Sequence, residues 1–188
     1  MRKGRKEINY QTLGRVSEII SSAKDMTGVA QSVVAELRDL LGLKGCALML
    51  LDRKTKELEV TAAAGLSDEY LHKGPLSAAK SIAASMTDGP VGIYNVEDDP
   101  RLQYPREAVR EGVKSILSVP LVLRGKPQGV LRLYTNQPWE FNMQDLTFVQ
   151  AIAELLALAL YTLRVTGAHK TSLEALKGLR PAARPAKG

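Results

Sequence analysis

Two pairs of short apolar segments constrain the fold of this chain more than any other feature. In the first pair, residues 46–51 and 57–64 lie on either side of a polar turn. In the second pair, residues 115–123 and 128–135 are arranged in the same way. Runs of this length around a turn predict β-hairpins, whose strands are antiparallel. The two pairs therefore predict a central antiparallel sheet.

Helical patterns lie on both sides of these hairpins. Residues 8–24, 28–41 and 142–165 place apolar side chains three and four positions apart, which is typical of amphipathic helices. We expect Gly42 to end the second helix and Gly167 to end the third. Helices at both ends of the chain can cover one face of the sheet, which predicts an α+β layered domain.

Shorter elements are expected between the hairpins. Residues 77–86 predict a helix, residues 91–96 a strand, and the segment after Pro105 a short helix that stops at Gly112. Asn142 is expected to cap the last long helix.

The net charge of +6 lies at the ends of the chain. Residues 1–7 sum to +3 and residues 166–188 to +4, so the part between them is close to neutral. We interpret residues 1–7 and 166–188 as basic tails, the second one flexible, around a domain at residues 8–165. A nucleic-acid-binding domain carries its positive charge on the fold, so nucleic acid is not expected as a partner. Weak contact of the tails with nucleic acid or an anionic surface is the alternative.

The chain shows no pattern of a secreted or membrane protein. No apolar segment follows the basic N-terminus, which argues against a signal peptide. The longest apolar stretch, residues 148–165, is interrupted by Gln150, Glu154 and Arg164. We expect a cytoplasmic protein without a membrane contact.

Few residues are available for catalysis or metal binding. Cys46 is the only cysteine, and the two histidines, His72 and His169, are far apart in the sequence. This excludes an internal disulfide and a metal site built from cysteines, and Cys46 is interpreted as a small core residue. No serine–histidine–aspartate set or phosphate-binding loop is recognisable. We therefore expect neither an enzyme nor a metal site.

Three segments resemble the GAF family of sensor domains. They are residues 45–52 with 63–66, residues 112–121 with 129–134, and Trp139-Glu140-Phe141 followed by Asp145-Leu146. The resemblance covers about residues 8–165. It implies an antiparallel sheet with terminal helices on one face and a pocket covered by helix and loop on the other. Members of the family bind cyclic nucleotides, tetrapyrroles, haem or small metabolites, or bind nothing.

The better-known subclasses of the family do not fit this sequence. The free methionine sulfoxide reductases need several cysteines for thiol–disulfide exchange. The position of Cys46 matches neither attachment site of the bilin-binding members, and the signature of the cyclic-nucleotide phosphodiesterases is absent. Haem-binding members need an axial histidine, and His72 lies where one could sit. A haem-based redox or gas sensor therefore stays an alternative, and the cofactor is unknown.

Alternation along the strands separates the two sheet faces. Ile116 and Ser118 share one face of their strand, as Arg132 and Tyr134 do of theirs, and these mixed faces are expected to meet the pocket. The nearly all-apolar opposite faces are expected to meet the terminal helices. In the first hairpin, the pocket side carries either Ala47, Met49 and Leu51 or Cys46, Leu48 and Leu50. Resemblance to the bilin-binding members favours the first set.

Arg132 is the most informative candidate for ligand binding. A guanidinium in a central strand is costly unless it is paired, and its geometry suits a carboxylate or phosphate. One hypothesis is a small anion held by Arg132, with Ser118 and Tyr134 as hydrogen-bond partners. Met49 and Ile116 would line the pocket, and Tyr104 would lie in a lid, unless its segment is a surface turn. The alternative pairs Arg132 with a nearby carboxylate of the chain: Glu97, Asp98 or Asp99.

The last helix has a wider apolar stripe than a sheet-covering helix needs. Leu155 and Leu158 extend this stripe beyond the arc of roughly 100° that covers a core. We expect the surplus to form a two-fold homodimer with the first helix, although core packing is the alternative. The sequence thus predicts a stand-alone sensory domain that binds a small ligand and signals through dimer-forming helices to a downstream protein. A ligand-free interaction scaffold is the alternative.

Overall fold

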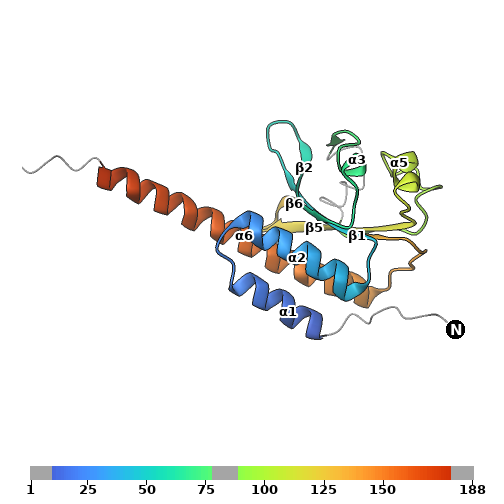
Figure 1. Cartoon of the computed structure of the whole chain (residues 1–188), viewed down its shortest axis with the longest axis horizontal. Helices are drawn as coiled ribbons and strands as arrows, with labels where there is room; N and C mark the ends of the chain where they lie inside the picture. Colours follow the sequence, from blue (N-terminus) through green and yellow to red (C-terminus); the bar gives the residue numbers. More distant parts are fainter. Residues whose placement is uncertain (1–9, 78–88, 179–188) are drawn as a thin grey trace, which may run out of the picture.

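A six-stranded antiparallel sheet forms the centre of the molecule (Figure 1). The computed structural model describes residues 10–77 and 89–178. The strand order is β3-β2-β1-β6-β5-β4. The strands are β1 (Gly45–Leu51), β2 (Glu57–Ala64), β3 (Leu76–Ser77), β4 (Val91–Ile93), β5 (Ser115–Leu123) and β6 (Lys126–Thr135). The two predicted hairpins, β1–β2 and β5–β6, are both confirmed, and they are joined by pairing of β1 with β6.

Three helices lie on one side of this sheet, two of them against the strands and the first of them against the other two helices. They are α1 (Tyr10–Ser21), α2 (Met26–Leu41) and α6 (Met143–Gly178). Their apolar side chains form one core with the sheet residues that face them, among them Leu117, Leu131 and Leu133. The opposite face lies beneath α3 (Asp68–Leu71) and α5 (Pro105–Arg110) (Figure 1). The expected α+β architecture is therefore correct.

The ends of α2 follow from single residues. Asp25 caps its start by accepting a hydrogen bond from the Gly28 amide at 2.7 Å. Gly42 ends it in the left-handed conformation, with φ of 63°, and donates its N–H to the Arg38 carbonyl. The predicted stop at Gly42 is therefore confirmed.

A buried polar cluster fixes the start of α6. Asn142 and Asp145 exchange hydrogen bonds from backbone to side chain, at 2.9 and 3.1 Å, which forms a reciprocal cap. The Trp139 indole also donates to the Asp145 carboxylate at 3.2 Å. The Trp139 amide donates to the Ser115 hydroxyl at 2.8 Å, which ties this cap to strand β5.

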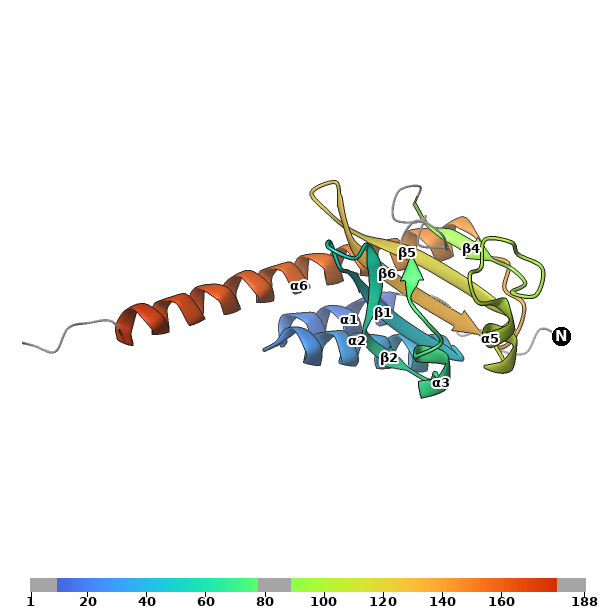
Figure 2. The same cartoon turned by 90° about the horizontal axis from the view of Figure 1, so that it is seen from above.

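Helix α6 does not end at Gly167, as the sequence predicted, but continues to Gly178. A single glycine costs only about 1 kcal/mol in a helix, which is too little to stop one that is well formed on both sides. The Thr171 and Ser172 hydroxyls donate to carbonyls one turn earlier. The helix extends beyond the sheet as an arm (Figures 1 and 2), so residues 166–178 are helical.

Three smaller differences lie in the connections. The structure has a short helix, α3, and a two-residue strand, β3, that the sequence pattern did not predict. Strand β6 begins at Lys126, because Arg124 and Gly125 both have positive φ and form a two-residue turn. The helix expected at residues 77–86 falls almost wholly outside the described residues.

By length and composition alone, α6 could cross a membrane. Its most apolar window within Met143–His169 has a mean hydropathy of 1.8. The same composition suits a helix that covers a sheet, and Val149, Ile152 and Leu156 are fully buried in the core. This core packing accounts for much of the apolar character.

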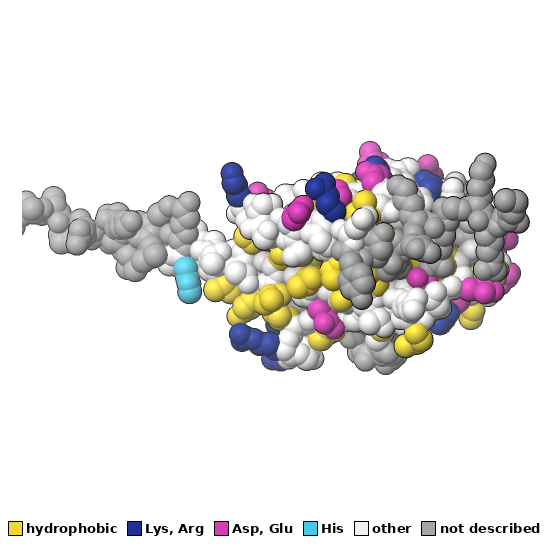
Figure 3. All heavy atoms as spheres, turned by 90° about the horizontal axis from the view of Figure 1, so that it is seen from below, with side chains coloured by type: hydrophobic (Ala, Val, Ile, Leu, Met, Phe, Trp, Pro, Cys, Tyr) yellow, Lys and Arg dark blue, Asp and Glu magenta, His cyan; other side chains and the backbone are white. Residues whose placement is uncertain are grey.

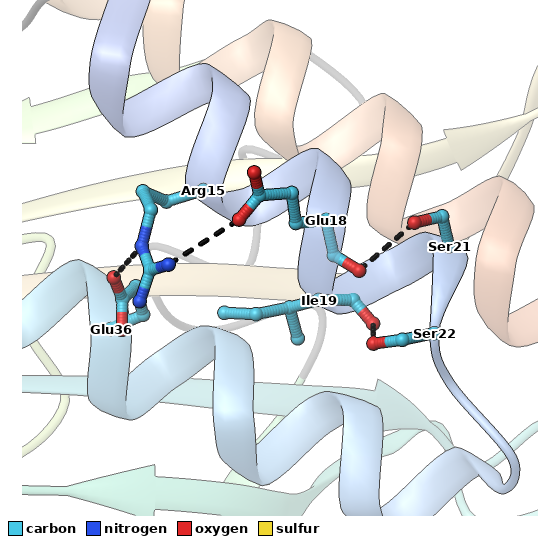
Figure 4. A network of polar contacts seen from close by, with 6 residues as sticks. All are labelled: Arg15, Glu18, Ile19, Ser21, Ser22 and Glu36. Atoms are coloured by element: carbon cyan, nitrogen blue, oxygen red, sulfur yellow. Dashed lines mark hydrogen bonds and ion pairs between the residues drawn. The ribbon is translucent and has the colours of Figure 1, made fainter.

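Helix α1 lies against α2 through apolar and polar contacts. Figure 4 shows Arg15 of α1 between Glu18 on its own helix and Glu36 of α2. The Ser21 and Ser22 hydroxyls donate to the Glu18 and Ile19 carbonyls, at 3.0 and 3.1 Å, and close the last turn of α1.

Candidate functional site

The two faces of the sheet carry the side chains that alternation predicts. Ile116 and Tyr134 belong to the apolar cluster under α3 and α5, and Leu117, Leu131 and Leu133 belong to the helix-side cluster. In the first hairpin, the set that faces α3 and α5 is Ala47, Met49 and Leu51. The set that faces the helices is Cys46, Leu48 and Leu50. The structure thus confirms the first of the two alternatives.

Five of the six predicted site residues lie on this face. Arg132 pairs across the sheet with Ala47 on one side and with Ser118 on the other. Arg132 is 2% exposed, and Ser118 and Tyr134 are fully buried. Met49 and Ile116 are also buried in the same region. The sheet therefore places a guanidinium among apolar and hydroxyl-bearing side chains.

The three carboxylates considered as partners of Arg132 bind other residues. Glu97 forms an ion pair with Lys114. The Asp98 carboxylate accepts a hydrogen bond from the Asn95 side chain at 2.7 Å. The Asp99 carboxylate pairs with Arg101, whose hydrogen bonds and charge lower the pKa of Asp99. These contacts do not support the alternative in which this loop holds Arg132.

Lys73 adds a second cation that the sequence pattern did not reveal. Its ammonium donates to the Tyr70 carbonyl at 2.8 Å and lies 3.8 Å from the centre of the Tyr70 ring. Burial, and after it the nearby charge of Arg132, lower the pKa of Lys73 to about 8. Lys73 follows a four-residue helix without periodicity, so no sequence signal marked it.

Two buried tyrosines accompany these cations. The Tyr70 ring meets the Tyr134 ring edge-on, with the ring centres 5.9 Å apart. Burial raises the pKa of both hydroxyls, and the charge of Arg132 opposes this effect. The site therefore combines two cations with neutral phenols.

Tyr104 holds the start of α5 against the loop that precedes β3. Its hydroxyl donates to the Pro75 carbonyl at 2.9 Å, and the Gln103 amide donates to the same oxygen at 2.9 Å. The Tyr104 hydroxyl lies so close to Gly74 that a Cβ there would be 2.5 Å from it. Tyr104 is half-buried against the cluster on this face. Tyr104 therefore lies in the layer that packs over this sheet face, and the strand residues form the face itself.

A hollow of about 370 Å³ opens between α3 and α5. Tyr70 lines it and contacts Tyr134 behind it. Glu111 also lines it and accepts hydrogen bonds from Lys44 and Ser67. Burial raises the pKa of Glu111, but these hydrogen bonds outweigh burial and hold the pKa below its usual value. The sequence pattern does not predict this hollow, because its walls come from short irregular elements.

The described residues offer no metal site. Within residues 10–77 and 89–178, no three histidine, cysteine, aspartate or glutamate side chains are grouped to hold an ion. His72 is exposed, and its Nδ1 lies 2.8 Å from the Asp68 carbonyl. Cys46 is fully buried in the helix-side core, where burial raises the pKa of its thiol.

The fold and the buried face define a small α+β domain, and comparison with known families identifies its class. A sequence profile of the GAF domain matches residues 23–160. This chain belongs to the GAF domain family. A search of curated proteins gave no match.

Solved structures of GAF domains share the fold at low sequence identity. The GAF domain of a phosphoenolpyruvate-protein phosphotransferase from Coxiella burnetii is 21% identical, with a TM-score of 0.76 over 84% of this chain and 95% of that chain. The free methionine-R-sulfoxide reductase from Neisseria meningitidis is 16% identical, with a TM-score of 0.71 over 88% and 99%. A domain of a putative two-component sensor histidine kinase from Sinorhizobium meliloti 1021 is 21% identical, with a TM-score of 0.67 over 79% and 99%. Sensory proteins are thus among the structural neighbours.

Proposed function

We propose that this chain is a sensory module that binds a small anion at Arg132 and signals through α6 to a partner protein. The observation that carries the proposal is the presence of two neighbouring cations, Arg132 and Lys73, on one buried side of the sheet. Like charges in a medium of low dielectric repel each other. An anion between them removes this repulsion and gains charge-assisted hydrogen bonds.

The surrounding side chains suit a small polar molecule. The Ser118 and Tyr134 hydroxyls flank Arg132 on the same face. Tyr70 and Tyr104 supply aromatic walls on the side of Lys73. An acid with a flat or apolar body and one or two carboxylates or phosphates matches these groups in charge and shape.

A route for a signal follows from the layers of the fold. Strands β5 and β6 carry Ser118 and Arg132 on the ligand side, and they carry Leu117 and Leu131 on the helix side. A change in the position of these strands therefore acts directly on α6, which packs on β5. Leu155 and Leu158 of α6 are exposed and would form a dimer contact that transmits the change.

The proposal includes no enzymatic step and places the protein in the cytoplasm. The thiol–disulfide chemistry of a sulfoxide reductase needs several thiols, and Cys46 is the only cysteine of this chain and is buried.

Thermal unfolding in the presence of small acids tests the ligand. Succinate, citrate, inorganic phosphate and a nucleoside monophosphate are compared on the wild type, Arg132→Lys and Lys73→Gln. We expect at least one acid to raise the Tm of the wild type, with a smaller rise in both variants. Lys54→Gln, in an exposed turn, is the matched control and should respond as the wild type does. If no acid raises the Tm of the wild type, the proposal is wrong. It is also wrong if the Tm of Arg132→Lys and of Lys73→Gln rises as much as that of the wild type.

A ligand-free interaction scaffold is the second candidate. The observation that favours it is the closed sheet face, since Met49, Ile116, Ser118, Arg132 and Tyr134 are all at most 2% exposed. Native mass spectrometry of the purified protein separates the two functions. A bound small molecule supports the sensor, whereas a bare polypeptide mass, together with no response to any acid, supports the scaffold.

A further inference from the structure

The two hairpin turns lie side by side at one end of the sheet. Leu50 of β1 and Leu121 of β5 both pair with Gly129 of β6, so the two hairpins turn at the same edge. The Arg53 guanidinium donates to the Gln128 side chain at 3.3 Å and joins the turns. Figure 2 shows both turns on the side toward which α6 extends.

This end of the domain is strongly basic, although the domain as a whole is nearly neutral. Asp52 lies among the cations, but its carboxylate stabilises its own turn by accepting hydrogen bonds from the Lys54 and Thr55 amides. Within residues 10–77 and 89–178, none of the six cations forms an ion pair with a carboxylate. The six cations are Arg53, Lys54, Lys56, Arg124, Lys126 and Arg164.

The Tyr161 ring of α6 contacts two of these cations. The Arg124 and Arg164 guanidinium carbons lie 5.4 and 5.7 Å from the centre of the Tyr161 ring. Such cation–π contacts hold an arginine in place while its N–H groups stay available. The two guanidiniums thus present their donors at the point where α6 leaves the sheet.

A small apolar hollow lies beneath these cations. Its volume is about 90 Å³, and its floor includes Met26, Leu50 and Leu160. Arg53 and Arg164 stand at its rim. The hollow exceeds the share of roughly 30 Å³ that a water molecule takes in the liquid. An aliphatic side chain fits the floor, and carboxylates beside it fit the rim.

We propose that this basic end docks an acidic segment of a partner protein, with one apolar side chain seated in the hollow. The surface is defined by Arg53, Arg124, Arg164 and Tyr161. The terminal segments outside the described part, residues 1–9 and 179–188, are both basic, so charge repulsion disfavours them as occupants. Residues 78–88 hold one lysine and one aspartate and are not an acidic segment. A nucleic acid would satisfy the cations but would leave the apolar floor without a matching group.

The position of the surface suits an output function. A segment docked there contacts both hairpins and α6 at once. Arg53 and Arg124 lie in the two hairpin turns, and Tyr161 and Arg164 belong to α6. Neither Arg132 nor Lys73 lines the hollow, so this inference stands without the ligand proposal. It assigns a chemical class to the partner, which the proposed function leaves open.

Fluorescence anisotropy with labelled probes tests the docking surface in the full chain. The probes are a peptide alternating glutamate and leucine, the same peptide with serine for leucine, the same peptide with lysine for glutamate, and a single-stranded DNA. We expect the glutamate–leucine peptide to bind more tightly than the other three, with an affinity that falls as salt is raised. Arg53→Glu and Arg164→Glu should each weaken it by about tenfold or more. Arg106→Glu, an exposed charge reversal in α5, should leave it unchanged.

Four outcomes would overturn the proposal. If the peptide with serine for leucine binds as tightly as the glutamate–leucine peptide, the apolar side chain does not contribute to docking. DNA binding as tightly would make the surface a nucleic-acid contact. Equal effects of Arg106→Glu and Arg164→Glu would make the binding non-specific. Self-association that disappears in Arg164→Glu, measured by light scattering, would make a second copy of the chain the occupant.

Discussion

The Lys73 ammonium lies 3.8 Å from the centre of the Tyr70 ring and donates a hydrogen bond to the Tyr70 carbonyl oxygen. This contact places a cation on the side of the sheet that also buries Arg132. Burial and the charge of Arg132 lower the pKa of Lys73 from 10.5 to about 8. The titration of Lys73 therefore couples the stability of the domain, and the binding of an anion, to pH.

We predict that the free energy of unfolding rises with pH from about 8 to 9.5 because of Lys73. In this interval the folded protein has lost the Lys73 proton, whereas the unfolded chain still holds it. The unfolded state thus binds more protons, and stability increases with pH. One proton gives a slope of at most about 1.4 kcal/mol per pH unit, and partial exposure of Lys73 reduces it. Urea titrations over this range should show the rise in the wild type and a flatter curve in Lys73→Gln.

Lys54→Gln, in the exposed first turn, is the control for this measurement. It should keep the pH dependence of the wild type. A Lys73→Gln curve that runs parallel to the wild-type curve would show that Lys73 does not carry the effect.

Replacing Asp145 should loosen the start of α6. Asp145→Ala removes the carboxylate that accepts hydrogen bonds from the Asn142 amide and the Trp139 indole. We expect a loss of about 2 kcal/mol in chemical denaturation. Asp145→Asn keeps one oxygen acceptor and should lose less. Equal stability of Asp145→Ala and the wild type would show that the cap contributes nothing.

Gly129 is required by the close approach of β1 and β6. A Cβ at this position would lie 2.1 Å from the Met49 carbonyl oxygen, which belongs to the backbone and cannot rotate away. We expect Gly129→Ala to cost about 1–3 kcal/mol of stability. Gly14→Ala, in α1 with open space around its Cβ, is the control and should be neutral or slightly stabilising. A Gly129→Ala protein as stable as the wild type would mean that the strands separate freely here.

Leu158 should contribute to association of the chain. It is 53% exposed on α6, and Figure 3 shows hydrophobic side chains gathered beside the point where this helix leaves the domain. We expect a dimer for the wild type in light scattering and a monomer for Leu158→Glu. Val109→Glu changes an apolar residue of similar exposure in α5 and should leave the dimer intact. A monomeric wild type at tens of micromolar would contradict the prediction.

The strand pattern predicted the sheet and the division of its faces, because alternation of side chains is a local property of an extended backbone. Ser118, Arg132 and Tyr134 were therefore assigned to one face from sequence. The same reasoning could not find Lys73 or Tyr70, since they reach the site from a short helix and a loop. Their position depends on contacts such as the Glu111–Ser67 hydrogen bond, which joins segments 44 residues apart.

The end of α6 shows a limit of local rules. Gly167 is a reasonable stop signal in isolation, but the helix continues past it. The preceding turns of α6 are held in the core by residues such as Leu156 and Leu160, and propagation from a formed helix costs little. Packing elsewhere in the helix therefore decides the conformation at Gly167.

The sequence alone determined the hairpins, the amphipathic helices, the buried face around Arg132 and the family. Periodicity, capping residues and turn chemistry act over a few residues and can be read directly from the chain. Only the tertiary structure decided that Arg53, Arg124 and Arg164 form one basic end and that Lys73 joins Arg132. The distribution of charge along the sequence does not predict this arrangement, because electrostatic energy depends on distance in space. Antiparallel pairing brings turns that are remote in the sequence to the same edge of the sheet.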